Sequence, residues 1–249
     1  MFDLTGKLAL VTGAGQNIGQ GIARHLAGRG ASVVVNDVRA ERAEATVAAI
    51  TRAQGTAFAA PFDVTDLDCV VAAVAGAVDR AGAPIDILVN NAGNGGANGM
   101  APSPFRTSDP ASWRGPIDVN LYGVLNCTHS VIDGMCARRW GRVITIASGA
   151  GLVGLRIGVS AYGAGKGGAI SFMRHLAVET ARDGVTANSI ALGLMGGVND
   201  PDSQMARQIP VGRLGTPDDV GAYCVYLASP EASWMTGQTV HLNGGAVTD

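Results

Sequence analysis

The amino-acid sequence alternates, from one end to the other, between short apolar runs and segments of helical periodicity, and this alternation constrains the fold more than any other feature. The apolar runs are rich in β-branched residues and too short for helices, so they predict strands. Because a helical segment separates each strand from the next, the strands are expected to pair in parallel through right-handed crossovers. The predicted strands are residues 8–12, 32–36, 56–60, 85–90, 142–147, 185–191 and 239–243.

The predicted strands are nearly continuous apolar stretches, which is the pattern of a sheet that helices cover on both faces. We therefore predict an α/β fold of the Rossmann type, a doubly wound sheet of about seven parallel strands, in a single domain over residues 1–249. In such a sheet the ligand crevice lies at the carboxyl ends of the strands, where the strand order reverses. The predicted helices begin near Ile18 and otherwise cover residues 41–52, 67–80, 111–138, 160–182 and 217–228.

Composition and charge argue against several classes of protein. A net charge of −2 leaves no basic stripe for nucleic acid, and no apolar stretch reaches the length of a membrane span. The first residues lack the basic and apolar segments of a signal peptide, and the four cysteines lack CxxC spacing, which together predict a cytoplasmic protein with free thiols. Cys127, His129 and Cys136 do not share one helix face, so no metal site is expected.

A glycine-rich turn follows the first predicted strand, with the sequence TGAGQNIG at residues 12–19. Glycines are common in strand–helix turns, but this one opens a helix whose N-terminus offers unpaired N–H groups and a positive dipole end. We therefore expect the turn to bind the pyrophosphate of a dinucleotide. The residues assigned to this contact are Gly13, Gln16, Asn17, Ile18 and Gly19.

Acidic and amide residues follow the next strands. Asp37 closes the second strand and can accept hydrogen bonds from an adenosine ribose while repelling a 2′-phosphate, which favours NAD over NADP. Arg39 lies two residues on and keeps NADP open, and an ordinary turn aspartate is the other interpretation of Asp37. Asp63 and Val64 follow the third strand, where Asp63 either contacts adenine or caps a helix.

The fourth strand ends in the sequence NNAG at residues 90–93, at the same predicted edge of the sheet. The amide of Asn90 is suited to bridging buried backbone groups, and Gly93 permits a close approach of the backbone to a ligand. We assign Asn90, Ala92 and Gly93 to the cofactor site.

Tyr162 and Lys166 stand four residues apart, so both side chains lie on one face of a predicted helix. The chain has only one other lysine, Lys7, and otherwise uses arginine for positive charge. An unperturbed tyrosine, with a pKa of about 10, is a poor acid–base catalyst at neutral pH. A neighbouring ammonium is expected to lower the pKa of Tyr162 toward the working range, and it can also hold a ribose hydroxyl. The alternative is a packed tyrosine beside a solvated lysine.

Two further polar residues lie near this pair in the predicted fold. Ser148 follows the fifth strand and can donate a hydrogen bond to a substrate carbonyl oxygen. Asn120 is a polar residue on an otherwise apolar helix, where it can bend the helix or hold a water for proton relay. Taken alone, each is also consistent with an ordinary structural role.

Together these residues resemble the short-chain dehydrogenase/reductase family in its single-domain form, and the resemblance spans essentially the whole chain. It also includes YGAGK (162–166), GRLGTPDDVG (212–221) and GQTVHLNGG (237–245). The resemblance implies oxidation of an alcohol or reduction of a ketone with NAD(H) or NADP(H), and assembly as a homotetramer. It implies Tyr162 as general acid–base, Lys166 as the nicotinamide-ribose ligand, Ser148 as the carbonyl-orienting residue and Asn120 as support of a water relay.

The sequence departs from the family pattern in three places. Asn17 replaces the usual middle glycine, and asparagine tolerates the left-handed conformation better than other residues. Leu192 precedes Gly193 in place of proline, and the usual threonine is absent from residues 194–197, so that backbone groups of Gly193 and Met195 are left to hold the nicotinamide. The substrate lid over 193–210 is shorter than usual and the loop 94–110 longer, from which we hypothesise that this loop covers part of the site.

The leading hypothesis is an oxidoreductase that transfers a hydride between NAD(H) and a secondary alcohol or ketone substrate, with no nucleic-acid or membrane partner. One alternative is an NADPH-dependent reductase of 3-oxoacyl thioesters carried on acyl carrier protein or CoA. Another is a non-catalytic nucleotide sensor or scaffold on the same fold, since a fold does not by itself define a function.

Overall fold

A seven-stranded, wholly parallel sheet forms the centre of the molecule, with the strand order β3-β2-β1-β4-β5-β6-β7. The computed structural model describes residues 1–93, 101–196 and 204–248. All seven predicted strands are confirmed, with ends shifted by one or two residues. The strands are β1 (Leu8–Val11), β2 (Ser32–Val35), β3 (Thr56–Ala59), β4 (Ile87–Asn90), β5 (Gly141–Ser148), β6 (Val185–Leu192) and β7 (Thr239–Leu242).

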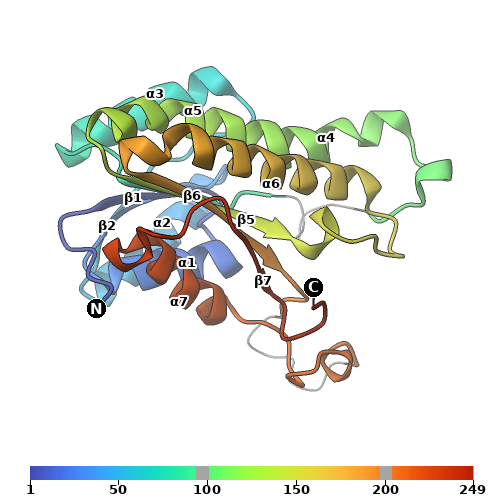
Figure 1. Ribbon diagram of the computed structural model, residues 1–249. Helices are drawn as coiled ribbons and strands as arrows, with labels where there is room; N and C mark the ends of the chain where they lie inside the picture. The colour runs from blue at the N-terminus through green and yellow to red at the C-terminus, as the bar shows by residue number, and fades with distance from the viewer. Residues whose placement is uncertain (94–100, 197–203, 249) are drawn as a thin grey trace.

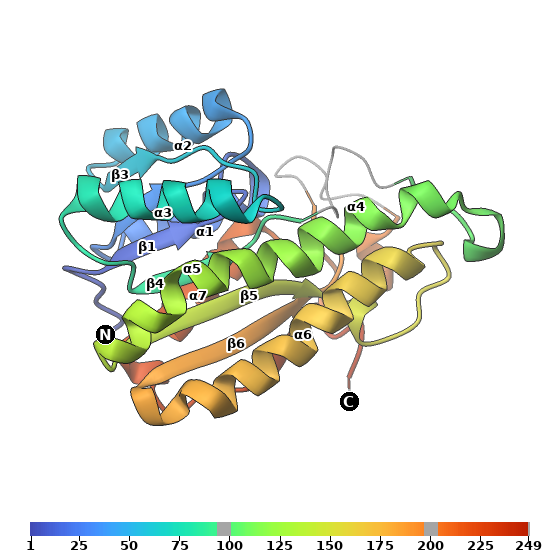
Figure 2. The same cartoon turned by 90° about the horizontal axis from the view of Figure 1, so that it is seen from above.

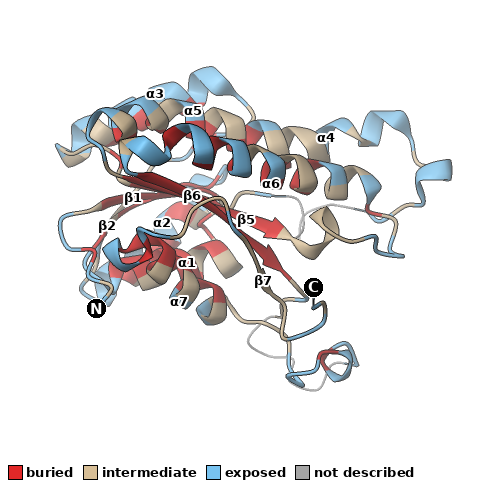
Figure 3. Cartoon of the chain, in the orientation of Figure 1, coloured by how far each residue is buried: buried red, intermediate tan, exposed pale blue. Residues whose placement is uncertain are grey.

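Helices cover both faces of the sheet, which confirms the doubly wound α/β fold of the Rossmann type. One layer holds α1, α2 and α7, and the opposite layer holds α3, α4, α5 and α6 (Figures 1 and 2). Figure 3 shows the buried strands between these two half-exposed layers. The helices are α1 (Asn17–Ala27), α2 (Ala40–Arg52), α3 (Leu67–Ala81), α4 (Arg114–Ile117), α5 (Gly123–Ala137), α6 (Ser160–Thr180) and α7 (Pro217–Ala228).

The hydrophobic core has two parts, one on each side of the sheet, because successive side chains of a strand point to opposite faces. Ala9 and Val11 of β1 pack in the layer with Ile22 of α1. Leu8 and Leu10 of the same strand pack in the layer with the helices of the opposite face. The nearly continuous apolar character of the strands therefore reflects burial on both faces.

The order of the strands reverses between β1 and β4, which are adjacent in the sheet although β2 and β3 separate them in sequence. The chain proceeds outward from β1 through β2 to β3, and then from β4 through β5 and β6 to β7. The carboxyl ends of β1 and β4 therefore flank a crevice of the kind in which doubly wound folds bind their ligands.

The predicted helix over residues 111–138 is interrupted. It consists of α4, a π-helical turn over Asp118–Tyr122, and α5. Asn120 lies in the centre of the π-helical turn and is fully buried. Such turns are rare within α-helices and occur often at functional sites. A polar residue at this position suggested an irregular helix. The structure has such an irregularity, in the form of a local change from α-helical to π-helical hydrogen bonding.

Candidate active site

The turn between β1 and α1 is held in an unusual backbone conformation. Gly13 has a φ of +60° and Asn17 a φ of +47°, so asparagine occupies the left-handed region in place of the usual glycine. A side chain at Gly19 would collide with the carbonyl of Gly13, so the helix can begin only where that side chain is missing. These positions explain why the turn needs glycine or a residue that tolerates a positive φ.

The start of α1 presents its backbone N–H groups to the crevice. Gln16 is extended at the N-cap, its side chain makes no capping hydrogen bond, and the first turn carries no acidic residue. The first N–H groups of a helix have no partner within the helix, so those of Asn17, Ile18 and Gly19 can receive a phosphate. Ile18 itself packs against the core and fixes the helix in place.

Asn91 joins the glycine-rich turn to the end of β4. The sequence had suggested its neighbour Asn90 for this role. The Nδ2 of Asn91 donates to the carbonyl oxygens of Thr12 at 2.9 Å and Gly13 at 3.0 Å. The hydroxyl of Thr12 in turn accepts from the N–H groups of Asn91 and Ala92, both at 3.0 Å. Ala92 therefore contributes to the site through its backbone, and the two strand ends on either side of the crevice form one braced unit.

Asn90 points elsewhere. Its Nδ2 donates to the hydroxyl of Thr128 on α5 at 3.2 Å and to that of Thr145 on β5 at 3.5 Å. Asn90 therefore ties strands and helix together beneath the crevice, and the bridging of backbone groups expected of it belongs to its neighbour Asn91.

Asp37 lies two residues beyond the end of β2 and turns its carboxylate toward the glycine-rich turn. Only 6% of the residue is exposed. Its Oδ2 accepts a hydrogen bond from the N–H of Gly15 at 3.2 Å, and its Oδ1 accepts one from the N–H of Arg39 at 3.0 Å. An ionised carboxylate has about four acceptor positions, so further ones remain for ribose hydroxyls. A Cβ at Gly15 would lie 2.5 Å from the Cβ of Arg42, which places a second arginine, unforeseen from the sequence, beside Asp37.

Asp63 and Val64 differ in their surroundings. Asp63 is exposed, and its Oδ1 accepts from the N–H of Thr65 at 2.9 Å and from its hydroxyl at 2.8 Å. The residue that caps α3 is Asp66, whose side chain accepts from the N–H of Cys69. Val64 is buried, and its carbonyl accepts from the Nδ2 of Asn126 on α5 at 3.0 Å.

Ser148 and Tyr162 meet at the carboxyl end of β5. Ser148 is the last residue of that strand, and its Oγ accepts from the N–H of Ala150 at 3.2 Å. Tyr162 is in the first turn of α6, near enough to Ser148 for the serine hydroxyl to lower the pKa of the phenol. The fold therefore joins two hydroxyl groups that are separated in the sequence by a loop.

Lys166 lies one helical turn beyond Tyr162 and is only 5% exposed. Its Nζ donates to the carbonyl of Ile146 at 2.7 Å and lies 5.9 Å from the centre of the Tyr162 ring. Burial lowers the pKa of this ammonium to about 8. The alternative of a solvated lysine does not describe this side chain.

The expected lowering of the Tyr162 pKa is not what the structure gives. Burial raises the pKa of Tyr162, and the nearby Ser148 hydroxyl offsets only part of that rise. The physical reason is that the phenol loses hydration while the ammonium of Lys166 contacts the Ile146 carbonyl instead of the phenolic oxygen. In this structure Tyr162 is therefore an acid that keeps its proton at neutral pH.

Asn120 and Gly93 complete this cluster. The Nδ2 of Asn120 donates to the carbonyl of Pro116 at 2.8 Å, whereas its buried Oδ1 makes no hydrogen bond within the described residues. A Cβ at Gly93 would lie 2.7 Å from that Oδ1 and 3.1 Å from the Nζ of Lys166. The three residues thus surround a small space in which a buried acceptor faces an ammonium.

Gly193 and Met195 follow β6 on the far side of the crevice. The N–H of Gly193 donates to the carbonyl of Leu242 at 3.0 Å, so this group is engaged by β7. Met195 forms a parallel bridge with Gly215, in which Leu194 and Gly196 supply the hydrogen-bonding groups. The N–H and C=O of Met195 therefore point away from Gly215. The loop residues 94–100, part of the hypothesised cover of the site, lie outside the described residues, as does Gly197.

The described residues also bear on metal binding and membrane insertion. Within residues 1–93, 101–196 and 204–248, no three histidine, cysteine, aspartate or glutamate side chains gather in a way that could hold a metal ion. None of the helices in that part of the chain combines the length and apolar character that crossing a membrane requires.

Known proteins are similar to this chain over nearly its whole length. The sequence model of a family described as enoyl-(acyl carrier protein) reductase matches residues 13–247. The 3-oxoacyl-[acyl-carrier-protein] reductase FabG of Vibrio harveyi is 38% identical over 250 residues, which cover 98% of each chain.

Two solved structures are similar throughout. A 3-oxoacyl-[acyl-carrier protein] reductase with bound NAD from Brucella melitensis has a TM-score of 0.91 at 30% identity and covers 99% of this chain and 94% of its own. A gluconate 5-dehydrogenase from Burkholderia cenocepacia J2315 in complex with NADP and tartrate has a TM-score of 0.89 at 33% identity, covering 98% of this chain and 96% of its own.

Proposed function

This chain belongs to the short-chain dehydrogenase/reductase family, an oxidoreductase family whose fold binds nicotinamide cofactors, and on that premise we propose that it transfers a hydride between NAD(H) and a secondary alcohol or the matching ketone. The observation that carries this proposal is the cluster of Ser148, Tyr162, Lys166 and Asn120 at the carboxyl edge of the sheet, beside a braced nucleotide turn.

Each side chain of this cluster has a role in the proposed reaction. The nicotinamide, when bound, supplies or accepts the hydride. Tyr162 gives its proton to the substrate oxygen as a ketone is reduced, and Ser148 donates a hydrogen bond to the same oxygen, where negative charge develops. The positive charge of Lys166 stabilises the phenolate that Tyr162 becomes. The Oδ1 of Asn120 accepts a hydrogen bond from a water that returns the proton.

The protonation states favour reduction at neutral pH. A raised pKa keeps Tyr162 in the acid form that ketone reduction consumes, and a pKa of about 8 keeps Lys166 mainly charged. Alcohol oxidation needs the phenolate, which burial disfavours. We therefore propose that near pH 7 the free enzyme is already in the protonation state that carbonyl reduction uses.

The preference for NAD(H) rests on Asp37, because a buried carboxylate at the adenosine end repels a 2′-phosphate. Arg39 and Arg42 lie beside Asp37 and are the groups that would favour NADP(H). The similar structures include one with NAD and one with NADP, so the preference is decided by comparing the rates with NADH and NADPH.

A second candidate is the reduction of 3-oxoacyl thioesters with NADPH, which the name of the Vibrio harveyi relative favours. The two candidates share the catalytic cluster and differ in substrate and cofactor. Assaying simple ketones and a 3-oxoacyl-CoA, each with NADH and with NADPH, separates them. Absence of turnover with every pair, together with intact dinucleotide binding, would favour the sensor or scaffold alternative.

A further inference from the structure

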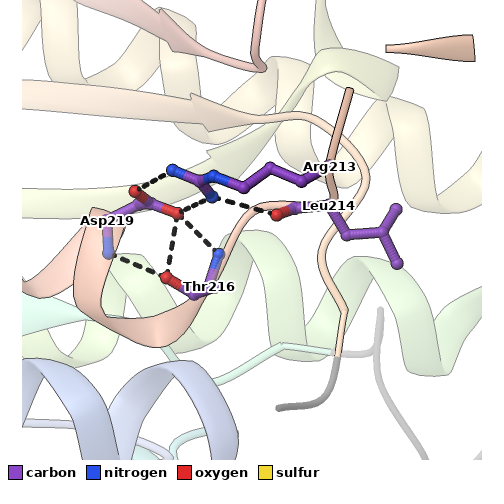
Figure 4. A network of polar contacts seen from close by, with 4 residues as sticks. All are labelled: Arg213, Leu214, Thr216 and Asp219. Carbon is purple, nitrogen blue, oxygen red and sulfur yellow. Dashed lines mark hydrogen bonds and ion pairs between the residues drawn. The ribbon is translucent and has the colours of Figure 1, made fainter. Parts of the chain in front are cut away.

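A charged and polar network fastens the segment before α7 to the first turn of that helix (Figure 4). Arg213 contacts Asp219 at two points, with Nη1 at 2.7 Å from Oδ2 and Nη2 at 2.8 Å from Oδ1. A two-point contact between a guanidinium and a carboxylate fixes orientation as well as distance. The Nη1 of Arg213 also donates to the carbonyl of Leu214 at 3.1 Å, so the guanidinium contacts the backbone of the next residue as well as Asp219.

The same carboxylate caps α7. Oδ2 of Asp219 accepts from the N–H of Thr216 at 2.8 Å and from its hydroxyl at 2.9 Å, while that hydroxyl accepts from the N–H of Asp219 at 3.3 Å. This reciprocal arrangement is a capping box. We call Arg213, Thr216 and Asp219 together the α7 clasp.

The α7 clasp is packed against α1 through Pro217. Pro217, the first residue of α7, packs so closely on α1 that a Cβ at Gly21 would lie 2.5 Å from the Cβ of the proline. Because α1 begins at the nucleotide turn, the clasp is joined through two packed helices to the pyrophosphate end of the crevice.

Gly215 lies inside the clasp, between Arg213 and Thr216, and pairs with the backbone after β6. Its N–H donates to the carbonyl of Leu194 at 3.0 Å, and its carbonyl accepts from the N–H of Gly196 at 3.0 Å. A Cβ at Gly215 would lie 2.6 Å from the Sδ of Met195, so the side chain of Met195 lies directly against this glycine. The position of Gly215 therefore sets the position of the Met195 backbone.

We propose that Arg213 and Asp219 are positioning residues that hold the backbone of residues 194–196 in the geometry that receives the nicotinamide half of the cofactor. This inference rests on the proposed function, because it takes the N–H and C=O of Met195 as nicotinamide contacts. Neither side chain touches the cofactor; both act through Gly215.

The test uses the full-length Arg213→Met variant, which keeps the apolar stem of the arginine and leaves the capping box of Thr216 and Asp219 intact. Arg139→Met is the matched control, because Arg139 forms an exposed ion pair with Asp183 at 3.8 Å, beyond the opposite end of β5. The readouts are hydrogen exchange of the Gly196 and Gly215 amides, thermal unfolding, and the affinities for NADH and for ADP-ribose, which keeps the pyrophosphate and both riboses and lacks only the nicotinamide.

The proposal expects Arg213→Met to speed exchange at both amides and to weaken NADH binding by about fivefold, the effect of losing one well-formed ion pair. ADP-ribose affinity should be unchanged, and Arg139→Met should behave like the wild type. Adding Asp219→Asn to Arg213→Met should not weaken NADH binding further if the pair acts as a unit.

Unchanged exchange, or unchanged NADH affinity despite faster exchange, would overturn the inference. An equal loss of NADH and ADP-ribose affinity with a lower Tm would also overturn it, because that pattern describes a general structural role. A wild-type protein that binds ADP-ribose but neither NADH nor NADPH would refute the proposed function, and the positioning role with it.

Discussion

The ammonium of Lys166 lies 5.9 Å from the centre of the Tyr162 ring, held there by a hydrogen bond of 2.7 Å to the carbonyl of Ile146. This relationship follows from their spacing of four residues on α6 and from the packing of that helix against β5. It fixes a positive charge near the phenol without a direct contact between the two groups. The charge is buried, and so its protonation is coupled to both folding and catalysis.

Stability should therefore depend on pH through Lys166. In the folded protein the pKa of Lys166 is about 8, below the ordinary value of 10.5. The unfolded chain therefore binds this proton more tightly than the folded protein does. As the pH rises between these two values, the free energy of unfolding of the wild type should increase. Relative to Lys166→Met, the gain should approach about 3 kcal/mol. Urea unfolding of both proteins at pH 7.5 and pH 10 measures it, and an equal difference at the two pH values would contradict the prediction.

Carbonyl reduction should also lose rate as Lys166 loses its charge. Tyr162 stays protonated because burial raises its pKa, so the fall above pH 8 is assigned to Lys166 alone. We expect kcat/KM for reduction, which reports the protonation of the free enzyme, to be level below pH 8 and to fall by about tenfold per pH unit above it. In Lys166→Arg, whose side chain stays charged, the fall should not occur at pH 8. A wild-type rate that is level to pH 10 would refute this assignment.

Replacing the carboxylate of Asp37 should relax the choice of cofactor. Asp37→Asn keeps the shape of the side chain and one acceptor oxygen, but it replaces the other oxygen by a donor and removes the charge that repels a 2′-phosphate. The ratio of kcat/KM for NADH to that for NADPH should fall by at least about tenfold. Asp79→Asn, an exposed aspartate near the far end of α3, is the control and should leave the ratio unchanged. No change in Asp37→Asn would mean that other groups decide the preference.

Gly93 should tolerate no side chain if the cluster works as proposed. In Gly93→Ala the new Cβ would lie 2.7 Å from the Oδ1 of Asn120 and 3.1 Å from the Nζ of Lys166, so one of these groups must move. A shift of this size should lower kcat by about 10- to 100-fold while the Tm changes little. Gly76→Ala, on α3 with open space around the added atom, should keep full activity and gain up to about 1 kcal/mol of stability. Equal activities of the two variants would argue against the cluster.

The fold could be predicted from the sequence because strand length, helical period and alternation are local properties. These properties located every strand within one or two residues, and the positive φ of Asn17 followed from its side-chain chemistry. The sequence indicated that Asn120 can bend its helix, but the π-helical form of that irregularity could not be predicted, because its period differs from that of an α-helix by too little to read over five residues. The pKa of Tyr162 could not be predicted either, since its direction depends on how deeply the packed chain buries the phenol.

Partners in the site that are distant in sequence were harder still to predict. Asn90 and Asn91 are adjacent and chemically identical, and only the pairing of β4 with β1 shows that Asn91 reaches Thr12 and Gly13. Arg42 comes beside Asp37 because α2 folds back over the glycine-rich turn. The contact of Arg213 with Asp219 spans six residues, but its link to Met195 exists only through the bridge to Gly215.

The central claim is that Tyr162 gives and takes the proton at the substrate oxygen, and Tyr162→Phe tests it most directly. The variant loses one oxygen atom and keeps the ring that packs on α6. Its steady-state kcat, measured with a ketone that the wild type reduces, should fall by at least about 1000-fold, while its affinity for NADH stays within twofold of the wild type. A kcat within tenfold of the wild type, with NADH still bound, would contradict the account.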